Sequence, residues 1–180
     1  MQHIAEIAER IRAIGFRCRR CGDCCRTLEN CPHRVFVGAR EVRSILSETT
    51  YHWDDVAEPY PEFIDAAGGG RYTLGWCIQH ADDRCLFLSE AGCAVYANRP
   101  WICRTYPFML HGDELIVSEC PGIGAPMTMD EAERIACDLL ARQIAEKLED
   151  DEVRTQLAKN VVPARVRAVI DSEGLKVLYG

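Results

Sequence analysis

The sequence predicts a small, irregular, cysteine-rich α+β domain with short strands and a C-terminal helical extension. Two stretches with helical periodicity, at 3–14 and 129–149, enclose a middle part of short apolar pieces separated by turn residues. Eleven of the 180 residues are cysteines, many of them at short spacings. We expect residues 1–125 to form the cysteine-rich domain, with the first helix included, and residues 126–180 to form the helical extension.

The N-terminal part begins with an amphipathic helix. Its apolar residues recur every three or four positions before Gly15, which ends the helix: Ile4, Ile7, Ala8, Ile11 and Ile14. The cysteine-dense stretch that follows is too irregular for a helix or a strand, and a short helix is predicted at 39–48. Residues 50–70 contain two prolines and three consecutive glycines, so they are predicted to form a loop or lid.

Strand patterns precede the long C-terminal helix. Residues 71–77 alternate in hydropathy as a strand does, and residues 108–120 read as a hairpin that turns at 111–113. Thr128 and Glu131 form a capping-box pattern that opens the long helix. An acidic run directly after this helix predicts a break before a second helical stretch, and the last twenty residues carry only weak signals.

The composition is that of a folded, acidic protein. The net charge is -7, and 48% of the residues are hydrophobic. An acidic chain binds phosphate backbones poorly, which argues against nucleic acid as a partner. No apolar stretch approaches the roughly 18 residues of a membrane span, and the first residues contain no apolar block of the signal-peptide type. We therefore expect a cytoplasmic protein and leave its oligomeric state open.

The first group of cysteines has the spacing of a metal-binding loop. Cys18, Cys21 and Cys24 are separated by two residues each, Cys25 follows directly, and Cys31 precedes a proline. Two-residue spacing lets a loop wrap so that its thiolates converge on one ion or cluster, and the run resembles half of a bacterial ferredoxin motif. An odd number of cysteines without an export signal argues against a disulfide framework.

Five further cysteines lie near the ends of predicted short strands or turns: Cys77, Cys85, Cys93, Cys103 and Cys120. None of them forms a CxxC pair, so their spacing alone is a weak signal. A cysteine-ligated site needs four thiolates. The two groups together therefore supply enough sulfur atoms for two sites.

The combination of the two groups resembles a known family. The matching pieces are FRCRRCGDCCR at 16–26, CLFL at 85–88, CAVY at 93–96, NRPWICRTYPF at 98–108 and Cys120. They are similar to the YkgJ-type cysteine-cluster proteins, which carry a CxxCxxCC motif and are described as a zinc- or iron-chelating domain. The resemblance covers most of the predicted cysteine-rich domain.

This resemblance implies that eight cysteines bind metal: Cys18, Cys21, Cys24, Cys25, Cys85, Cys93, Cys103 and Cys120. It leaves Cys31, Cys77 and Cys137 as additions. Members are often labelled iron–sulfur oxidoreductases, and a flagellin lysine-N-methylase has a similar cysteine pattern, so the resemblance allows an enzyme as well. No catalytic residue follows from the sequence, and whether the chain is an enzyme stays open.

Arg99 and Arg104 flank Cys103 within the matching segment. A tetrathiolate site carries about two net negative charges, which are costly to bury and which nearby guanidinium groups stabilise. Arginine donors also form hydrogen bonds with thiolate sulfurs. We therefore predict that both arginines contact the bound cofactor or its ligands. The aromatic residues of this segment are expected either to shield the site from water or to pack in the core.

The other candidate ligands have competing interpretations. Cys137 is predicted to pack in the core, because it shares a helical face with four apolar residues: Leu140, Ala141, Ile144 and Leu148. For Cys31 and Cys77 the sequence favours a ligand and a core residue about equally. Three histidines in polar loops are predicted to be solvated rather than to bind zinc: His33, His80 and His111.

Ligation by cysteine alone fits either an iron–sulfur cluster or zinc. The ferredoxin-like start favours iron–sulfur, with 4Fe-4S as the expected type, whereas the adjacent Cys24 and Cys25 are awkward for one tetrahedral zinc. We predict a redox or electron-transfer role in a complex with a protein partner. The alternatives are a zinc-binding structural or interaction module and a protein-modifying enzyme of the methylase type.

Overall fold

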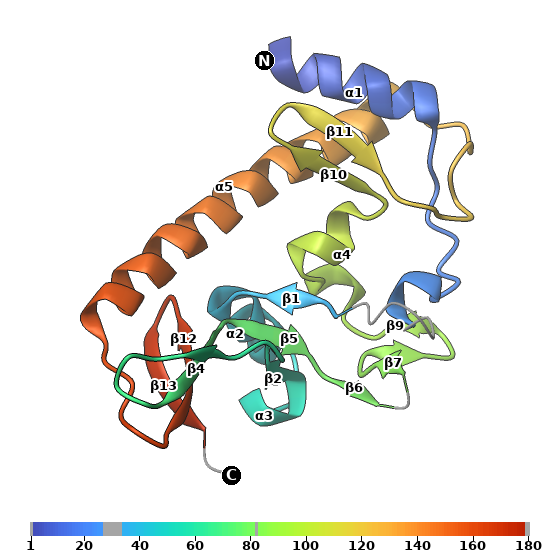
Figure 1. The fold of residues 1–180 in the computed structure, drawn as a ribbon. Helices are drawn as coiled ribbons and strands as arrows, with labels where there is room; N and C mark the ends of the chain where they lie inside the picture. The colour runs from blue at the N-terminus through green and yellow to red at the C-terminus, as the bar shows by residue number, and fades with distance from the viewer. Residues whose placement is uncertain (1, 27–33, 82, 179–180) are drawn as a thin grey trace. The chain divides into compact units, whose positions relative to one another are not determined.

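The computed structural model describes residues 2–26, 34–81 and 83–178. It confirms a mixed α+β fold with many short strands and a long C-terminal helix (Figure 1). The chain divides into two compact units: unit 1 is Met1–Arg26 with Phe87–Ala145, and unit 2 is Thr27–Leu86 with Glu146–Gly180. The predicted division into a cysteine-rich domain, 1–125, and a helical extension, 126–180, stays a prediction.

Unit 1 consists of helices, two antiparallel strand pairs and short 3-10 turns. Its elements are α1 (Gln2–Ile14), η1 (Asp23–Cys25), β8 (Leu88–Ser89), β9 (Gly92–Cys93), η2 (Tyr96–Asn98), α4 (Trp101–Thr105), β10 (Phe108–His111), β11 (Glu114–Val117) and the first part of α5 (Met129–Lys159). β8 pairs with β9, and β10 pairs with β11, both antiparallel. α1, the β10–β11 hairpin and α5 enclose a core in which Ile7, Ile11, Phe108 and Leu139 are buried.

The predicted first helix and hairpin are confirmed. α1 ends where Gly15 takes a φ of 73° and donates its N–H to the Ile11 carbonyl at 2.9 Å. The hairpin pairs Phe108 with Val117 and turns at Gly112, as the sequence predicts. Both features are local, because they depend only on neighbouring residues and on a glycine that accepts a positive φ.

α5 begins with the predicted capping box. The N–H of Thr128 donates to Glu131 Oε2 at 2.7 Å, and the N–H of Glu131 donates to Thr128 Oγ1 at 3.3 Å. These bonds from Thr128 lower the pKa of Glu131. Of the helices in the described ranges, none is long and apolar enough to cross a membrane.

The predicted break after residue 149 is wrong, since α5 continues to Lys159. The acidic residues there find partners within unit 2. Glu149 Oε1 accepts hydrogen bonds from the Ala39 N–H at 3.1 Å and from Ser172 Oγ at 2.7 Å, and Glu152 pairs with a neighbouring arginine. These contacts satisfy the carboxylates, so the run of acidic residues does not end the helix.

Unit 2 contains a four-stranded sheet and a three-stranded sheet. Its elements are β1 (Phe36–Val37), α2 (Ala39–Ser47), α3 (Trp53–Val56), β2 (Ala57–Pro59), β3 (Ile64–Asp65), β4 (Arg71–Leu74), β5 (Trp76–Ile78), β6 (His80–Ala81), β7 (Arg84–Cys85), the end of α5, β12 (Arg167–Asp171) and β13 (Gly174–Leu178). The larger sheet has the order β13-β12-β4-β3, with β12 parallel to β4, and the smaller has the order β1-β5-β2.

Two expectations for this unit need correction. The stretch 71–77 is not one strand, because Gly75 has a φ of 86° and separates β4 from β5, which belong to different sheets. The stretch 50–70, predicted as a loop, contains α3, β2 and β3. The last twenty residues, which gave weak signals, supply the antiparallel pair β12–β13.

Gly70 lies where the chain passes close to the segment before β12. A Cβ atom at this position would meet the Pro163 carbonyl oxygen, approach Val162 Cγ1 to 2.7 Å and the Val166 carbonyl oxygen to 2.9 Å. Two of these neighbours are backbone atoms, so a change of side-chain rotamer cannot relieve the clash. We expect Gly70→Ala to lower the free energy of unfolding by about 2 kcal/mol, measured by urea denaturation. Gly112→Asn is the control, because open space surrounds Gly112 and Asn tolerates its positive φ; an equal loss in both variants would contradict the prediction.

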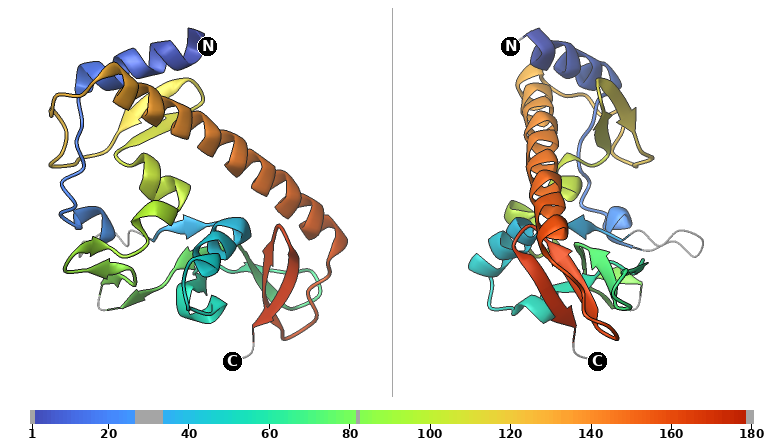
Figure 2. Two further views of the ribbon diagram at one scale, coloured as in Figure 1. Left: turned by 180° about the vertical axis from the view of Figure 1, so that it is seen from behind. Right: turned by 60° about the vertical axis from the view of Figure 1, so that its left-hand side comes forward.

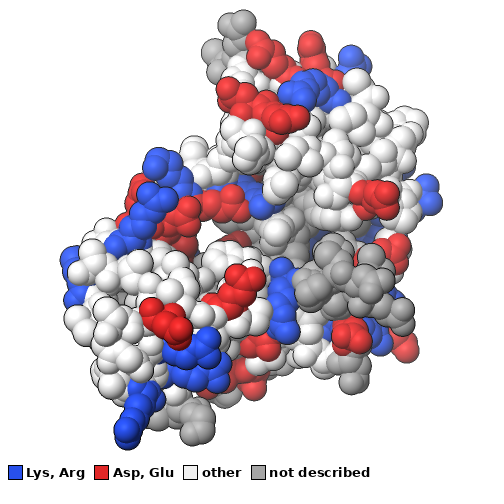
Figure 3. Space-filling model, viewed as in Figure 1, with Lys and Arg blue, Asp and Glu red and all other residues white. Residues whose placement is uncertain are grey.

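Ion pairs connect α2 with the β12–β13 turn. Arg43 donates to both carboxylate oxygens of Glu173, and Lys176 Nζ lies 3.0 Å from Glu173 Oε2 and 2.7 Å from Asp171 Oδ2. On the face seen in Figure 3, basic and acidic side chains are interspersed, as such pairing requires. The hydrogen bond from Arg43, with smaller contributions from Lys176, lowers the pKa of Glu173 to about 2.

This lowered pKa predicts a defined loss of stability in acid. Because the carboxylate is favoured in the folded state, Glu173 stabilises the fold above its ordinary pKa near 4.5, and this stabilisation disappears as the pH falls toward 2. We expect Glu173→Gln to be less stable than the parent at pH 7 and equally stable at pH 2. Unfolding by denaturant across this pH range measures the difference, and a difference that does not vary with pH would contradict the assignment.

Candidate metal centre

The cysteine loop of unit 1 lies beside the segment that carries Cys120. The N–H of Arg17 donates to the Gly122 carbonyl at 3.0 Å, and the N–H of Gly124 donates to the Gly15 carbonyl at 3.0 Å. Figures 1 and 2 show the chain that follows α1 beside the chain that precedes α5. These backbone bonds bring together two segments that are far apart in the sequence.

Gly22 shapes the loop in front of the two adjacent cysteines. It has φ 79° and ψ 3° at the start of η1, and a Cβ atom there would lie 2.8 Å from Leu88 Cδ1. The Sγ atoms of Cys24 and Cys25 lie 3.8 Å apart. The hydrogen bond with Cys25 raises the pKa of the Cys24 thiol, burial and the charge of Cys25 raise it further, and Arg99 opposes the rise. Two thiolates this close repel each other, so the pair favours either protons or a metal cation.

Tyr106 is influenced by the charges of cysteines from distant segments. Its pKa is raised by burial first, and then by the thiolates of Cys120, Cys24 and Cys21. Cys93, on β9, has a pKa that is raised by burial, and Cys24 contributes in the same direction. Cysteines from the cysteine loop, from β9 and from the segment before α5 thus interact electrostatically within unit 1. The sulfur of Cys120 also accepts a backbone N–H two residues further along, at 3.4 Å.

Arg99 supplies positive charge to these cysteines. Its guanidinium favours the thiolate forms of Cys24 and Cys93. The side chain is held in place by backbone acceptors, since Nε donates to the Tyr96 carbonyl at 2.9 Å and a terminal nitrogen donates to the Cys103 carbonyl at 3.3 Å. The predicted electrostatic role of Arg99 is thus consistent with its position.

The ring of Tyr96 is a contact that the sequence did not single out. The guanidinium carbon of Arg99 lies 3.7 Å from the ring centroid, and that of Arg20 lies 4.5 Å from it. The guanidinium carbon of Arg104 lies instead 4.7 Å from the centroid of the Trp101 ring. The predicted contact of Arg104 with a cofactor stays a prediction. The only signal for Tyr96 in the sequence is its place between a cysteine and an arginine of the motif.

Unit 1 holds seven of the eight cysteines that the resemblance marks as ligands: Cys18, Cys21, Cys24, Cys25, Cys93, Cys103 and Cys120. The eighth, Cys85, belongs to unit 2, where it is half-buried on β7 opposite His80. Cys31 and His33 lie outside the described residues. Within the described ranges, no three or more Cys, His, Asp or Glu side chains are placed so as to hold a metal ion. By their chemistry, the clustered thiols are the donors that zinc and iron prefer.

A comparison with models of protein families shows to which family this chain is related. The model of the CxxCxxCC family, described as a putative zinc- or iron-chelating domain, matches residues 17–138. The chain belongs to the CxxCxxCC family. Comparisons with curated proteins and with solved structures gave no match. The resemblance noted in the sequence is confirmed, and it extends past the last predicted ligand into α5.

Within this CxxCxxCC domain, Cys77 and two of the candidate histidines have defined environments. Cys77 is fully buried on β5, between β1 and β2, and burial raises its pKa to about 11. These properties favour a core residue over a ligand. Two of the three candidate histidines lie within the described residues: His111 is exposed, whereas His80 is half-buried, with Nδ1 2.9 Å from the Ile78 carbonyl oxygen.

The prediction that Cys137 packs in the core is wrong, because its side chain is exposed. Ile144, which was expected on the same buried face, is 63% exposed. The residues that α5 buries are instead Ala132, Ala136, Leu139 and Arg142. One residue turns a helix by about 100°, so an error of one position was enough to select the wrong face.

Proposed function

We propose that this CxxCxxCC protein is cytosolic, carries an iron–sulfur cluster of the 4Fe-4S type, and transfers electrons within a complex with a protein partner. The observation that supports it is the family match over residues 17–138, and the electrostatic effects of Cys21, Cys24 and Cys120 on Tyr106 agree with it. None of the ten cysteines that the structure describes forms a disulfide, which fits the reducing conditions of the cytosol.

The number of thiols favours more than one metal atom. Unit 1 contains seven of the eight cysteines of the motif, whereas a single tetrahedral ion uses four. A 4Fe-4S cluster takes four cysteine thiolates, each bound to a different iron. We propose the eight cysteines of the motif as the set from which the ligands come, and a cluster held there would supply one-electron transfer.

The surroundings of the sulfurs fit a redox role. Cluster potentials depend on net charge, on hydrogen bonds to the sulfurs and on exposure to solvent. In unit 1 Arg99 provides the charge, and the Gly122 N–H provides a hydrogen bond to Cys120 Sγ. Tyr106 donates its hydroxyl to the Glu119 carbonyl. Arg99 and the Gly122 N–H would each stabilise a thiolate, whereas burial and the neighbouring Cys25 favour the protonated form of Cys24 until a cation binds.

A zinc-binding structural or interaction module is the second candidate, and one distance favours it. In a tetrahedral site with Zn–S bonds of about 2.3 Å, two sulfurs lie about 3.8 Å apart. The Cys24 and Cys25 sulfurs have this separation. On this alternative, zinc would stabilise the loop-rich part of unit 1 and leave its surface for a protein partner.

Anaerobic purification followed by metal and sulfide analysis separates the two. We expect a brown protein with visible absorbance that contains iron and acid-labile sulfide. A colourless protein with stoichiometric zinc would establish the alternative instead. A protein that binds neither metal after reconstitution would refute both.

A further inference from the structure

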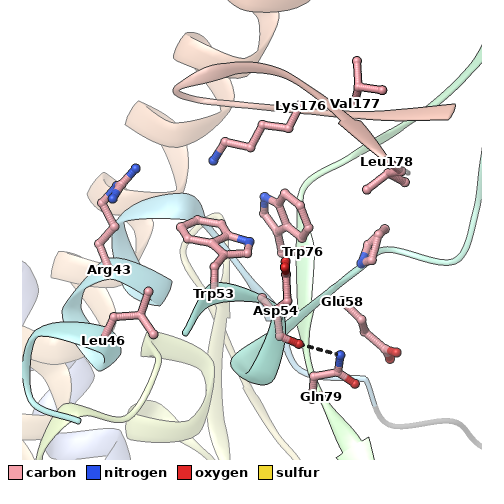
Figure 4. Close-up of a pocket in the computed structure, with 12 residues that line it drawn as sticks. Arg43, Leu46, Trp53, Asp54, Glu58, Trp76, Gln79, Lys176, Val177 and Leu178 are labelled. Atoms are coloured by element: carbon pink, nitrogen blue, oxygen red, sulfur yellow. Dashed lines mark hydrogen bonds between the residues drawn. The ribbon is translucent and has the colours of Figure 1, made fainter. Parts of the chain in front are cut away.

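Unit 2 contains a pocket of about 580 Å³ (Figure 4). No cysteine is among the described residues that line it. α2, α3, β2, β5 and β13 contribute its walls. Trp53 and Trp76 form one corner, with ring centroids 5.3 Å apart and planes at 77°. Leu46, Pro59 and Leu178 add aliphatic surface. The volume is in the range of small-molecule sites, which are mostly apolar with a few fixed polar groups.

The polar groups of this pocket include an unsatisfied donor and an unpaired acceptor. Trp53 Nε1 is buried and has no hydrogen-bond partner among the described residues. A buried N–H without an acceptor is costly, so an acceptor atom from outside the chain, of a water molecule or of a ligand, would stabilise it. The neighbouring Asp54 carboxylate forms no ion pair within the part of the chain that the structure describes. Figure 4 shows the Trp53 nitrogen and the Asp54 side chain beside Trp76, and the Asp54 carbonyl accepts the Gln79 side-chain N–H at 3.2 Å.

The charges on the rim argue against an ionic ligand. Lys176 Nζ lies 4.1 Å from the Trp53 ring centroid and 5.6 Å from that of Trp76, so an organic cation on these rings would compete with the chain's own ammonium. Lys176 and Arg43 are in turn paired with Asp171 and Glu173. The cations are therefore neutralised, and Asp54 would repel an anion.

We propose that this pocket binds an uncharged, planar nitrogen heterocycle of the purine class. Its ring would lie against the indoles, a ring nitrogen or carbonyl would accept the Trp53 Nε1 hydrogen, and N–H groups on the same edge would donate to Asp54. The ligand is a free nucleoside or base rather than a nucleic acid, since the chain carries a net charge of -7. This site is independent of the metal proposed for unit 1.

The test is a titration with guanosine and inosine, followed by indole fluorescence and calorimetry. Trp101→Phe serves as the parent, because it leaves Trp53 and Trp76 as the only tryptophans of the chain. We expect saturable quenching by the nucleosides. Trp53→Phe, which keeps an aromatic ring but removes the donor, and Asp54→Asn should each weaken binding by about tenfold or more.

Asp54→Asn keeps the test decisive if Trp53→Phe perturbs folding, because the Asp54 side chain is exposed and forms no ion pair with any described residue. Circular dichroism checks the fold of both variants. The proposal fails if neither nucleoside binds, if choline binds more tightly than the nucleosides, or if a single-stranded oligodeoxynucleotide does. It also fails if both folded variants bind as the parent does.

Discussion

Cys21→Ser is expected to lose most of the metal that the parent protein binds. Zinc and iron–sulfur sites both prefer a soft thiolate ligand, and serine offers a hard, protonated oxygen in its place. Changes in groups that only support metal ligands already cost about 10–100-fold in affinity, so loss of a ligand should cost more than about a hundredfold. Metal content after gel filtration, measured by elemental analysis, gives the result.

Cys137→Ser is the matched control for this prediction. It makes the same chemical change within unit 1 and within the segment that matches the family, but on an exposed face of α5. We expect it to keep the metal content of the parent. Equal losses in the two variants would mean that the cysteine loop has no special role, and the proposed ligand set would have to be abandoned.

The features that the sequence predicts well are those with local causes. The first helix ends at Gly15, and the long helix begins at the Thr128–Glu131 box, because each signal lies within four residues of the element it defines. The hairpin around Gly112 is predictable for the same reason. The continuation of α5 past Glu149 was not predictable, since its partners Ala39 and Ser172 are remote in sequence.

In the candidate site, too, local features can be predicted from the sequence, whereas contacts between distant segments cannot. The spacing of the cysteines and the RPxxCR segment are enough to identify the family and a set of candidate ligands. They do not predict that Arg20 and Arg99 share the ring of Tyr96, nor that the charges of three cysteines act on Tyr106, because these interactions join separate segments. The pocket beside Trp53 and Trp76 has no motif at all, and only the fold of unit 2 brings the two indoles together.

Asp171→Ala should be the most destabilising substitution in unit 2. The side chain is 1% exposed, and its Oδ2 accepts the Trp76 Nε1 hydrogen at 2.8 Å and lies 2.7 Å from Lys176 Nζ. Its Oδ1 accepts the Glu173 N–H at 2.9 Å. Removal of one partner from a buried ion pair costs about 3–5 kcal/mol, and we expect about 3 kcal/mol because Lys176 is partly exposed and keeps Glu173.

Asp151→Ala tests whether this loss comes from burial rather than from charge. Asp151 pairs with Lys147 one turn away on α5, and both side chains are largely exposed, so the pair should contribute less than about 0.5 kcal/mol. Asp171→Asn should fall between the two, since its amide oxygen can still accept the indole N–H. Urea unfolding followed by tryptophan fluorescence orders the three variants. If Asp171→Ala proves no less stable than Asp151→Ala, the network around Trp76 does not hold this unit together.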